Sequence, residues 1–180
     1  MVSCSQILRA KFMAILEILK YPDPRLRIKA QPVKEIDAEL HRIIDDMYET
    51  MYDAKGVGLA ATQVNIHRQI FTMDVSETRD QRICIFNPEI ISKSGIQYEG
   101  EGCLSVGGGA FDKVERAAIV HMRGMGLDGK TIELEAEGLM AVCIQHEIDH
   151  LNGILFIDHL SKLKQERIRK KINKSDRRDE

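Results

Sequence analysis

The sequence lacks tryptophan, and it lacks any apolar run long enough to cross a membrane. Hydrophobic residues make up 43% of the 180-residue chain and charged residues 30%, yet no stretch approaches the roughly 18 consecutive apolar residues of a spanning helix. Internal repeats, low-complexity tracts and linkers are also missing. We therefore expect a single domain outside the membrane, because a core of this size buries enough apolar surface to offset the entropy lost on folding.

Cysteine is scarce, and no two cysteines have the spacing of a pair. The four cysteines are Cys4, Cys84, Cys103 and Cys143. This distribution argues against a disulfide framework and for a reducing compartment. Any of the four can therefore serve as a free thiolate ligand.

The first twelve residues do not match the pattern of a secretory signal. Residues 1–12 contain no acidic residue, but they have neither the long apolar region nor the small-residue cleavage site of such a signal. We expect this segment to be a disordered extension or an alternative start, and residues 13–180 to form the single domain. A cytoplasmic location is favoured over import into an organelle.

Charge is distributed unevenly along the chain. The formal net charge is −2, but residues 161–178 hold nine Lys or Arg against Glu166 and Asp176, a local charge of +7. With Asp179 and Glu180 adding −2, residues 1–160 carry −7. A basic segment on an acidic body can bind polyanions such as RNA. An ordinary solvated helix face would have the same composition.

Helical patterns flank a β-rich middle region. The first helix has an apolar stripe at helical spacing, made of Leu40, Ile43, Ile44, Met47 and Met51. Asp37 is its expected N-cap, and Gly56 is the expected residue just past its C-terminal end. Two more helices are expected, 139–152 closed by Gly153, and 162–173 opened by Ser161.

Short β-rich runs separated by Gly, Pro and Asn lie between the first two helices. The runs are 70–75, 83–86, 89–91, 117–122 and 131–135. The turn at Asp128-Gly129 before the last run is typical of a β-hairpin. Because helices and strands are segregated along the chain, we expect an α+β fold with mostly antiparallel β-sheets.

The most specific local pattern is His146-Glu147-Ile148-Asp149-His150. Two imidazoles four positions apart lie on one helix face, so they can bind one metal ion. Glu147 follows His146 and precedes His150 by three residues, so its carboxylate can approach the open side of the metal and act on water. Polar groups in an otherwise apolar helix need partners. The pattern therefore predicts a central metal-binding helix.

A catalytic centre of this kind needs a third protein ligand and a free position for water. Cys143 shares the helix face, but it is seven residues from His150, about 10 Å along the axis. Its side chain leans away from the histidine pair, so we assign it to the wall of the site. Cys103 is the better candidate, because Gly102 lets the backbone come close. On its own, the segment 101–105 would indicate an ordinary buried cysteine.

A third segment, Gly56 to Gln63, follows the first helix. Its glycines at 56 and 58 allow unusual backbone angles and close approach of a ligand. Gln63 adds an amide donor that can stabilise negative charge developing on an oxygen. By itself this segment could equally be a helix end followed by a tight turn.

In this order, segments 56–63, 101–105 and 146–150 resemble the three signature motifs of the peptide deformylase family. The resemblance extends from about Met13 through residues 164–169, nearly the whole chain. It implies a metal-dependent hydrolase of the bacterial cytoplasm. Such an enzyme removes the N-terminal formyl group from formyl-methionyl nascent polypeptides. We expect a monomer.

The resemblance also implies the metal ligands and the catalytic groups. The metal would be held by Cys103, His146 and His150, with Fe²⁺ in the cell and Zn²⁺, Ni²⁺ or Co²⁺ after purification in air. Glu147 would act as general base and then as general acid. The Gln63 amide and the Leu104 backbone N–H would stabilise the tetrahedral oxyanion.

Substrate contacts are implied in the same way. Gly56, Val57 and Gly58 would form strand-like hydrogen bonds with an extended peptide, and Glu101 and Gly102 are further expected contacts. The pocket for the methionine side chain would be lined by Leu139, Val142 and Cys143, whose surfaces suit a thioether. The basic helix at 161–178 would contact the ribosome.

The chain departs from the family after its Cys-Leu-Ser segment. The family commonly has a proline there, whereas this chain has three glycines at 107–109. We expect residues 107–110 to form a mobile or reshaped rim of the substrate cleft, with metal binding intact. Arg116 matches an arginine of the family, which we assign to structural pairing in preference to substrate contact.

Two other functions remain open at this stage. A zinc endopeptidase uses the same helix motif with a downstream third ligand, for which Glu166 has a suitable spacing. A non-catalytic RNA-binding module would use the basic helix as its contact surface and a structural metal closed by four protein ligands.

Overall fold

The computed structural model describes residues 14–179, so the expected extension at 1–12 lies outside the described residues. The α-helices are α1 (Ala38–Asp53), α2 (Gly138–Leu151) and α3 (Lys162–Asp179). The strands are β1 (Gly58–Ala60), β2 (Ile70–Met73), β3 (Ile83–Ser94), β4 (Gln97–Gly102), β5 (Phe111–Arg116), β6 (Ile119–Met125) and β7 (Thr131–Glu137). Three short 3₁₀-helices are η1 (Pro24–Arg27), η2 (Ala61–Val64) and η3 (Phe156–His159). From Ala14 to Asp179, no helix is long and apolar enough to span a membrane.

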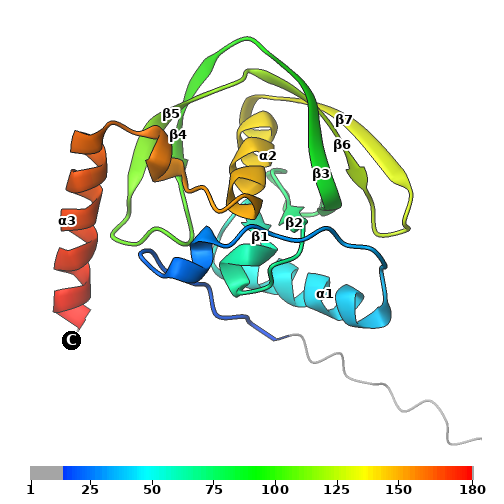
Figure 1. Cartoon of the computed structure of the whole chain (residues 1–180), viewed down its shortest axis with the longest axis horizontal. Helices are drawn as coiled ribbons and strands as arrows, with labels where there is room; N and C mark the ends of the chain where they lie inside the picture. Colours follow the sequence, from blue (N-terminus) through cyan, green and yellow to red (C-terminus); the bar gives the residue numbers. More distant parts are fainter. Residues whose placement is uncertain (1–13, 180) are drawn as a thin grey trace, which may run out of the picture.

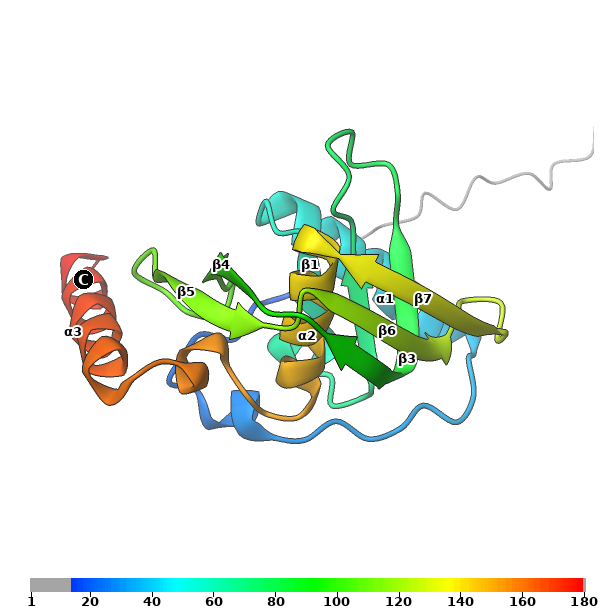
Figure 2. The ribbon, with the colours of Figure 1, turned by 90° about the horizontal axis from the view of Figure 1, so that it is seen from above.

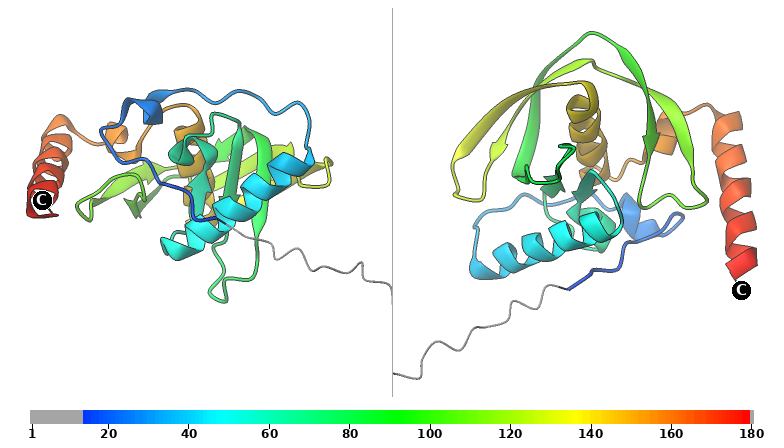
Figure 3. Two further views of the ribbon diagram at one scale, coloured as in Figure 1. Left: turned by 90° about the horizontal axis from the view of Figure 1, so that it is seen from below. Right: turned by 180° about the vertical axis from the view of Figure 1, so that it is seen from behind.

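The strands form two antiparallel sheets around α2 (Figures 1 and 2). The larger sheet has the order β1-β2-β3-β6-β7, and β4 pairs with β5 separately. Phe71 and Met73 pack in a cluster with residues of α2, whereas Ile70 packs with residues of α1. Successive strand side chains point to opposite faces, so the two helices cover opposite faces of this part of the sheet (Figure 3). The expected α+β class and antiparallel pairing are confirmed.

The ends of α1 are set by local hydrogen bonds. The side chain of Asp37 accepts a hydrogen bond from the Leu40 N–H at 2.8 Å, which confirms the expected N-cap. At the other end, the left-handed residue is Lys55, with φ 56°, and not Gly56. The Gly56 N–H instead donates to the Met51 carbonyl at 2.8 Å. The helix therefore ends in a Schellman-type turn that leads directly into β1.

The β region differs from the expectation in three places. The runs expected at 83–86 and 89–91 are one strand, β3, because a register shift near Asn87 carries the chain across without ending it. Strands β4 and β5 were not expected, because charged residues and glycine obscure their alternation. Strand β1 was missed within the glycine-containing segment. The hairpin at Asp128-Gly129 is confirmed between β6 and β7.

The last helix, α3, runs beyond the expected end at residue 173 and lies at one side of the molecule beside β5 (Figure 1). Although it is highly charged, Ile168 and Ile172 are 8% and 3% exposed. They pack with Val106 and Ala110, which flank the triple-glycine loop. One face of α3 is therefore buried, and the rest of the described helix surface is largely solvated.

Gly108 is the point where this loop touches the α3 backbone. Its φ is +67°, and a Cβ added there would lie 3.3 Å from the Ile172 nitrogen. The neighbouring Gly109 carbonyl accepts a hydrogen bond from Lys171 Nζ at 3.1 Å. A glycine at position 108 thus accommodates the close approach of α3.

We predict that Gly108→Ala loosens α3, and Gly129→Ala provides the matched control. Both substitutions place a Cβ on a left-handed backbone, at φ +67° and +75°, which costs roughly 1–2 kcal/mol of unfolding free energy. Only at Gly108 does the Cβ also press on α3, since nothing lies within 4 Å of one at Gly129. Limited trypsin digestion should cleave α3 faster in Gly108→Ala alone. Equal cleavage rates in the two variants would contradict this packing.

Candidate metal centre

Three side chains that can ligate a metal meet at one point. His146 and His150 project from successive turns of α2, and Cys103 directly follows β4. The Cys103 Sγ lies 3.1 Å from His150 Nε2, which lies 3.2 Å from His146 Nε2. All three ligand atoms lie within 4.8 Å of one another. The structure thus brings together the residues that the resemblance assigned to the metal.

These distances suit one small divalent cation. Around a tetrahedral ion with metal–nitrogen bonds of about 2.0 Å and a metal–sulfur bond of about 2.3 Å, ligand atoms would lie about 3.3–3.6 Å apart. The observed separations of 3.1 and 3.2 Å are close to that range. One thiolate and two imidazoles form a donor set accepted by zinc, iron, cobalt and nickel. The residues present therefore fit a single metal ion.

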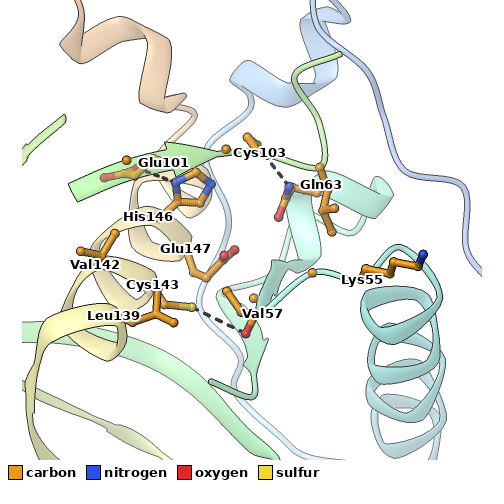
Figure 4. A pocket seen from close by; sticks show the side chains of 15 residues that line it. Lys55, Val57, Gln63, Glu101, Cys103, Leu139, Val142, Cys143, His146 and Glu147 are labelled. Carbon is orange, nitrogen blue, oxygen red and sulfur yellow. Dashed lines mark hydrogen bonds and ion pairs between the residues drawn. The ribbon is translucent and has the colours of Figure 1, made fainter. Parts of the chain in front are cut away.

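A buried network of charged groups orients His146. Its Nδ1 lies 2.8 Å from Glu101 Oε2, and Figure 4 marks this contact with a dashed line. The same carboxylate accepts from Arg116 Nε at 2.6 Å. Arg116 also donates to Asp149 Oδ2 at 2.6 Å, and this oxygen lies 2.7 Å from His159 Nε2. With Nδ1 bound to a carboxylate, Nε2 of His146 faces the other two ligand atoms. A proton on Nδ1 and a lone pair on Nε2 is the tautomer that a metal requires here.

This network gives the Glu101 side chain a role that the sequence did not indicate. One carboxylate oxygen accepts from Arg116 and the other is shared by Arg116 and His146. The carboxylate therefore links His146 to a buried arginine. The expected contact of Glu101 with substrate stays a prediction. The assignment of Arg116 to structural pairing is confirmed by its ion pairs with Glu101 and Asp149.

The two imidazoles have different proton affinities. Burial opposes protonation of His146, but hydrogen bonds with Cys103 and Glu101 raise its pKa well above the usual value. Burial, together with the positive charge at His146, holds the pKa of His150 well below the usual value. His150 thus offers a neutral lone pair, and binding a cation would displace the proton that His146 favours.

Glu147 is a buried carboxylate with one free oxygen. The residue is 3% exposed, and its Oε2 has no hydrogen-bond partner among the described residues. Burial raises the pKa of Glu147 to about 7, against the opposing effect of His146. A Cβ at Gly58 would lie 2.3 Å from Glu147 Oε1, so only glycine permits this approach. A carboxyl group with a pKa near neutrality can both accept and donate a proton.

Gln63 directs its amide at the segment that carries Cys103. Its Oε1 accepts from the Ala60 N–H at 2.9 Å, which leaves Nε2 to donate to Ser105 Oγ at 3.1 Å. The same Nε2 lies 3.7 Å from Cys103 Sγ. No local pattern indicates Ala60 and Ser105 as partners of Gln63, because these contacts form only in the folded chain.

A cavity of about 350 Å³ opens beside these groups (Figure 4). Every residue assigned to metal, catalysis or substrate lines it except His150, which is buried next to His146. Lys55 and Gly100 also line the cavity and were missed, although each adjoins an assigned segment. Cys143 lies in the wall as expected, with its Sγ 3.8 Å from the Val57 carbonyl oxygen.

The glycine-rich loop does not border this cavity. Residues 107–110 are absent from its lining and pack toward α3. The expectation that residues 107–110 form the rim of the cleft is therefore wrong, because this loop lies against α3. Their mobility stays a prediction.

Neither alternative function finds its metal ligands here. Glu166, the third ligand that an endopeptidase would need, is exposed on α3 and does not belong to the ligating group. A closed structural site needs four protein ligands, but the group found among residues 14–179 holds three. The arrangement is that of an open site facing a cavity.

Comparison with known proteins agrees with this geometry. Residues 15–166 match the family described as polypeptide deformylase. A peptide deformylase of Chromobacterium violaceum is 54% identical over 167 residues, which cover 93% of this chain and 99% of the relative. The crystal structure of a peptide deformylase from Legionella pneumophila superposes with a TM-score of 0.88 at 48% identity, covering 91% of this chain and 96% of that one. A peptide deformylase from Ehrlichia chaffeensis in complex with actinonin gives 0.87 at 38% identity, with 92% and 99% covered. The chain therefore belongs to the peptide deformylase family.

Proposed function

We propose that the protein removes the N-terminal formyl group from formyl-methionyl nascent polypeptides by hydrolysis. The observation that carries this proposal is the open triad of Cys103, His146 and His150 beside the unpartnered oxygen of Glu147. Action on nascent chains implies the compartment of the ribosomes, which is the bacterial cytoplasm.

Each catalytic group has a task that its position supports. Cys103, His146 and His150 would hold a divalent cation, which when bound would supply Lewis acidity toward water and an amide carbonyl. Glu147 accepts the proton of the attacking water and then donates a proton to the departing amine. The Gln63 Nε2 and the Leu104 backbone N–H donate to the oxygen that gains negative charge in the transition state.

The substrate's main chain fits between two strand edges. Strand β1 ends the larger sheet, and β4 has β5 on one side only. Gly58 of β1 and residues 100–102 of β4 both line the cavity. An extended peptide can add to such edges through backbone hydrogen bonds. Leu139, Val142 and Cys143 on α2 then form the pocket for the methionine side chain.

For the finer assignments, we propose Fe²⁺ as the cellular metal, since family resemblance favours it over zinc, nickel or cobalt. We also propose that the enzyme is a monomer and that α3 contacts the ribosome. Arg167, Lys170 and Lys174 are exposed on α3, away from the buried Ile168 and Ile172. A basic face of this kind attracts the phosphates of RNA.

Glu147→Gln tests the proposed acid–base group. Gln cannot accept or donate the proton, so turnover of formyl-Met-Ala-Ser should fall about 10²- to 10⁴-fold. Metal content after anaerobic purification should equal that of the wild type, because Glu147 is outside the ligand set. The control Glu135→Gln removes an exposed carboxylate and should leave turnover unchanged. Turnover near the wild-type value in Glu147→Gln would refute the assignment. Cleavage of internal peptide bonds by the wild type would favour an endopeptidase.

Glu101→Gln tests the support of His146. Loss of the carboxylate removes the charged partner of Nδ1 and should weaken metal affinity about 10- to 100-fold. The matched control is Glu115→Gln on β5, where the carboxylate accepts from the exposed Tyr98 hydroxyl at 2.6 Å. Metal dissociation constants measured by competition with a chelator give the comparison. Equal constants for the two variants would show that the network does not support the ligand.

The proposed ribosome contact is tested by reversing the charge of exposed basic residues of α3 while its buried face stays unchanged. The double variant Lys170→Glu, Lys174→Glu alters exposed positions and keeps Ile168 and Ile172 in place. Arg167 is left unchanged because it interacts with Asp112 of β5. Co-sedimentation with ribosomes at low salt should be lost, and its salt dependence should flatten. Deformylation of a short formyl peptide should persist. Unchanged co-sedimentation would exclude α3 as the contact.

A further inference from the structure

The connection between β2 and β3, residues 74–82, projects from the body near α1 (Figure 2). It contacts Gly56 and Val57, which line the cavity. Arg79 in this connection donates a hydrogen bond from Nη2 to the Gly56 carbonyl. Its Nη1 donates to the Asp74 carbonyl at 3.2 Å. Gly56 lines the cavity, whereas Arg79 is not among the lining residues. The Arg79 guanidinium therefore binds the Gly56 carbonyl from outside the cavity.

Arg79 is itself fixed by its neighbours. Its guanidinium carbon lies 5.0 Å from the centre of the Tyr52 ring, within cation–π range. The Tyr52 hydroxyl donates to the fully buried Asp74 carboxylate at 2.7 Å. The backbone of Arg79 has φ 58°, a conformation that a non-glycine residue adopts only when its surroundings require it. The contact with Gly56 is thus built into the connection.

Holding the Gly56 carbonyl also fixes the next N–H. The Gly56–Val57 peptide is trans, so the Val57 N–H points opposite to the Gly56 carbonyl. Because Arg79 binds the Gly56 carbonyl, the Val57 N–H is directed away from residues 74–82. The Val57 carbonyl is held by the same connection, through the Asp74 N–H at 2.9 Å. Two successive carbonyls of the cavity segment are thereby fixed by residues 74–82.

We propose that Arg79 is a positioning residue for the substrate's main chain. It aligns the Gly56–Val57 peptide so that the Val57 N–H donates to a carbonyl of the extended formyl peptide. This inference rests on the proposed function, and it assigns to a residue outside the cavity a part of the enzyme's affinity for peptide. Arg79 touches neither substrate nor the reacting atoms, so its removal acts on binding and leaves the chemical step intact.

Arg79→Ala is the test variant and Arg82→Ala is its matched control. Arg82 lies in the same connection and also stacks 5.0 Å from the Tyr52 ring, but its ion pair is with Glu49 at 3.5 Å. With formyl-Met-Ala-Ser, we expect Arg79→Ala to raise KM about three- to tenfold, the worth of one hydrogen bond. Its kcat and metal content should stay at wild-type values. Arg82→Ala should match the wild type in all three, and Arg79→Lys should recover part of the loss in KM.

An assay without substrate separates this inference from the proposed function. In ¹H–¹⁵N spectra of the metal-loaded protein, the Val57 amide signal should move in Arg79→Ala and stay in place in Arg82→Ala. If the wild type fails to deformylate, the proposed function is lost, yet the Val57 signal still reports on the alignment. An unmoved Val57 signal in Arg79→Ala overturns the inference. So does an equal rise in KM in both alanine variants, because it would show that the cluster acts only as a scaffold.

Discussion

The carboxylate of Glu101 joins β4 to α2, and the geometry of the site depends on that junction. Glu101 is 4% exposed, and His146 and Arg116, its two partners, are 8% and 7% exposed. Charges so far from water are tolerated only when paired and hydrogen-bonded. Asp149 shares the positive charge of Arg116. The four side chains therefore stabilise one another, and removal of any one would take a partner from a buried charged group.

The junction has a direct consequence for the metal ligands. Once Glu101 is fixed on α2, Cys103 two residues later is carried to the imidazoles of His146 and His150. A small residue allows strand β1 to approach α2 closely. Gly58 places β1 against Glu147, where any Cβ would collide with the carboxylate. The same packing that satisfies the polar groups of α2 thus brings the peptide-binding edge next to the proposed acid–base group.

Several parts of this arrangement could be predicted from the sequence alone. The spacing of His146 and His150 fixed their common face, and the apolar stripe of α1 and the Asp128-Gly129 hairpin follow local rules. Cys103 could be chosen over Cys143 because helical side chains have a defined direction. These features depend on near neighbours in the chain, or on motifs that resemble a known family.

Other parts could not be predicted, because they depend on long-range contacts. The partnership of Arg116 with Asp149 joins residues 33 positions apart, and that of Arg79 with Gly56 joins residues 23 apart. No local periodicity encodes either pair. The glycine-rich loop was placed at the cleft because it follows Cys103 closely. In the folded chain it packs on α3, where Ile168 and Ile172 need a partner.

X-ray absorption at the metal edge of the anaerobically prepared enzyme tests the central claim most directly. The account predicts one sulfur and two imidazole nitrogens bound to a single ion. In a zinc-loaded sample the sulfur should lie at about 2.3 Å and the nitrogens at about 2.0–2.1 Å. In Cys103→Ala, the sulfur contribution should disappear. A wild-type spectrum with nitrogen and oxygen neighbours but no sulfur would contradict the proposed centre.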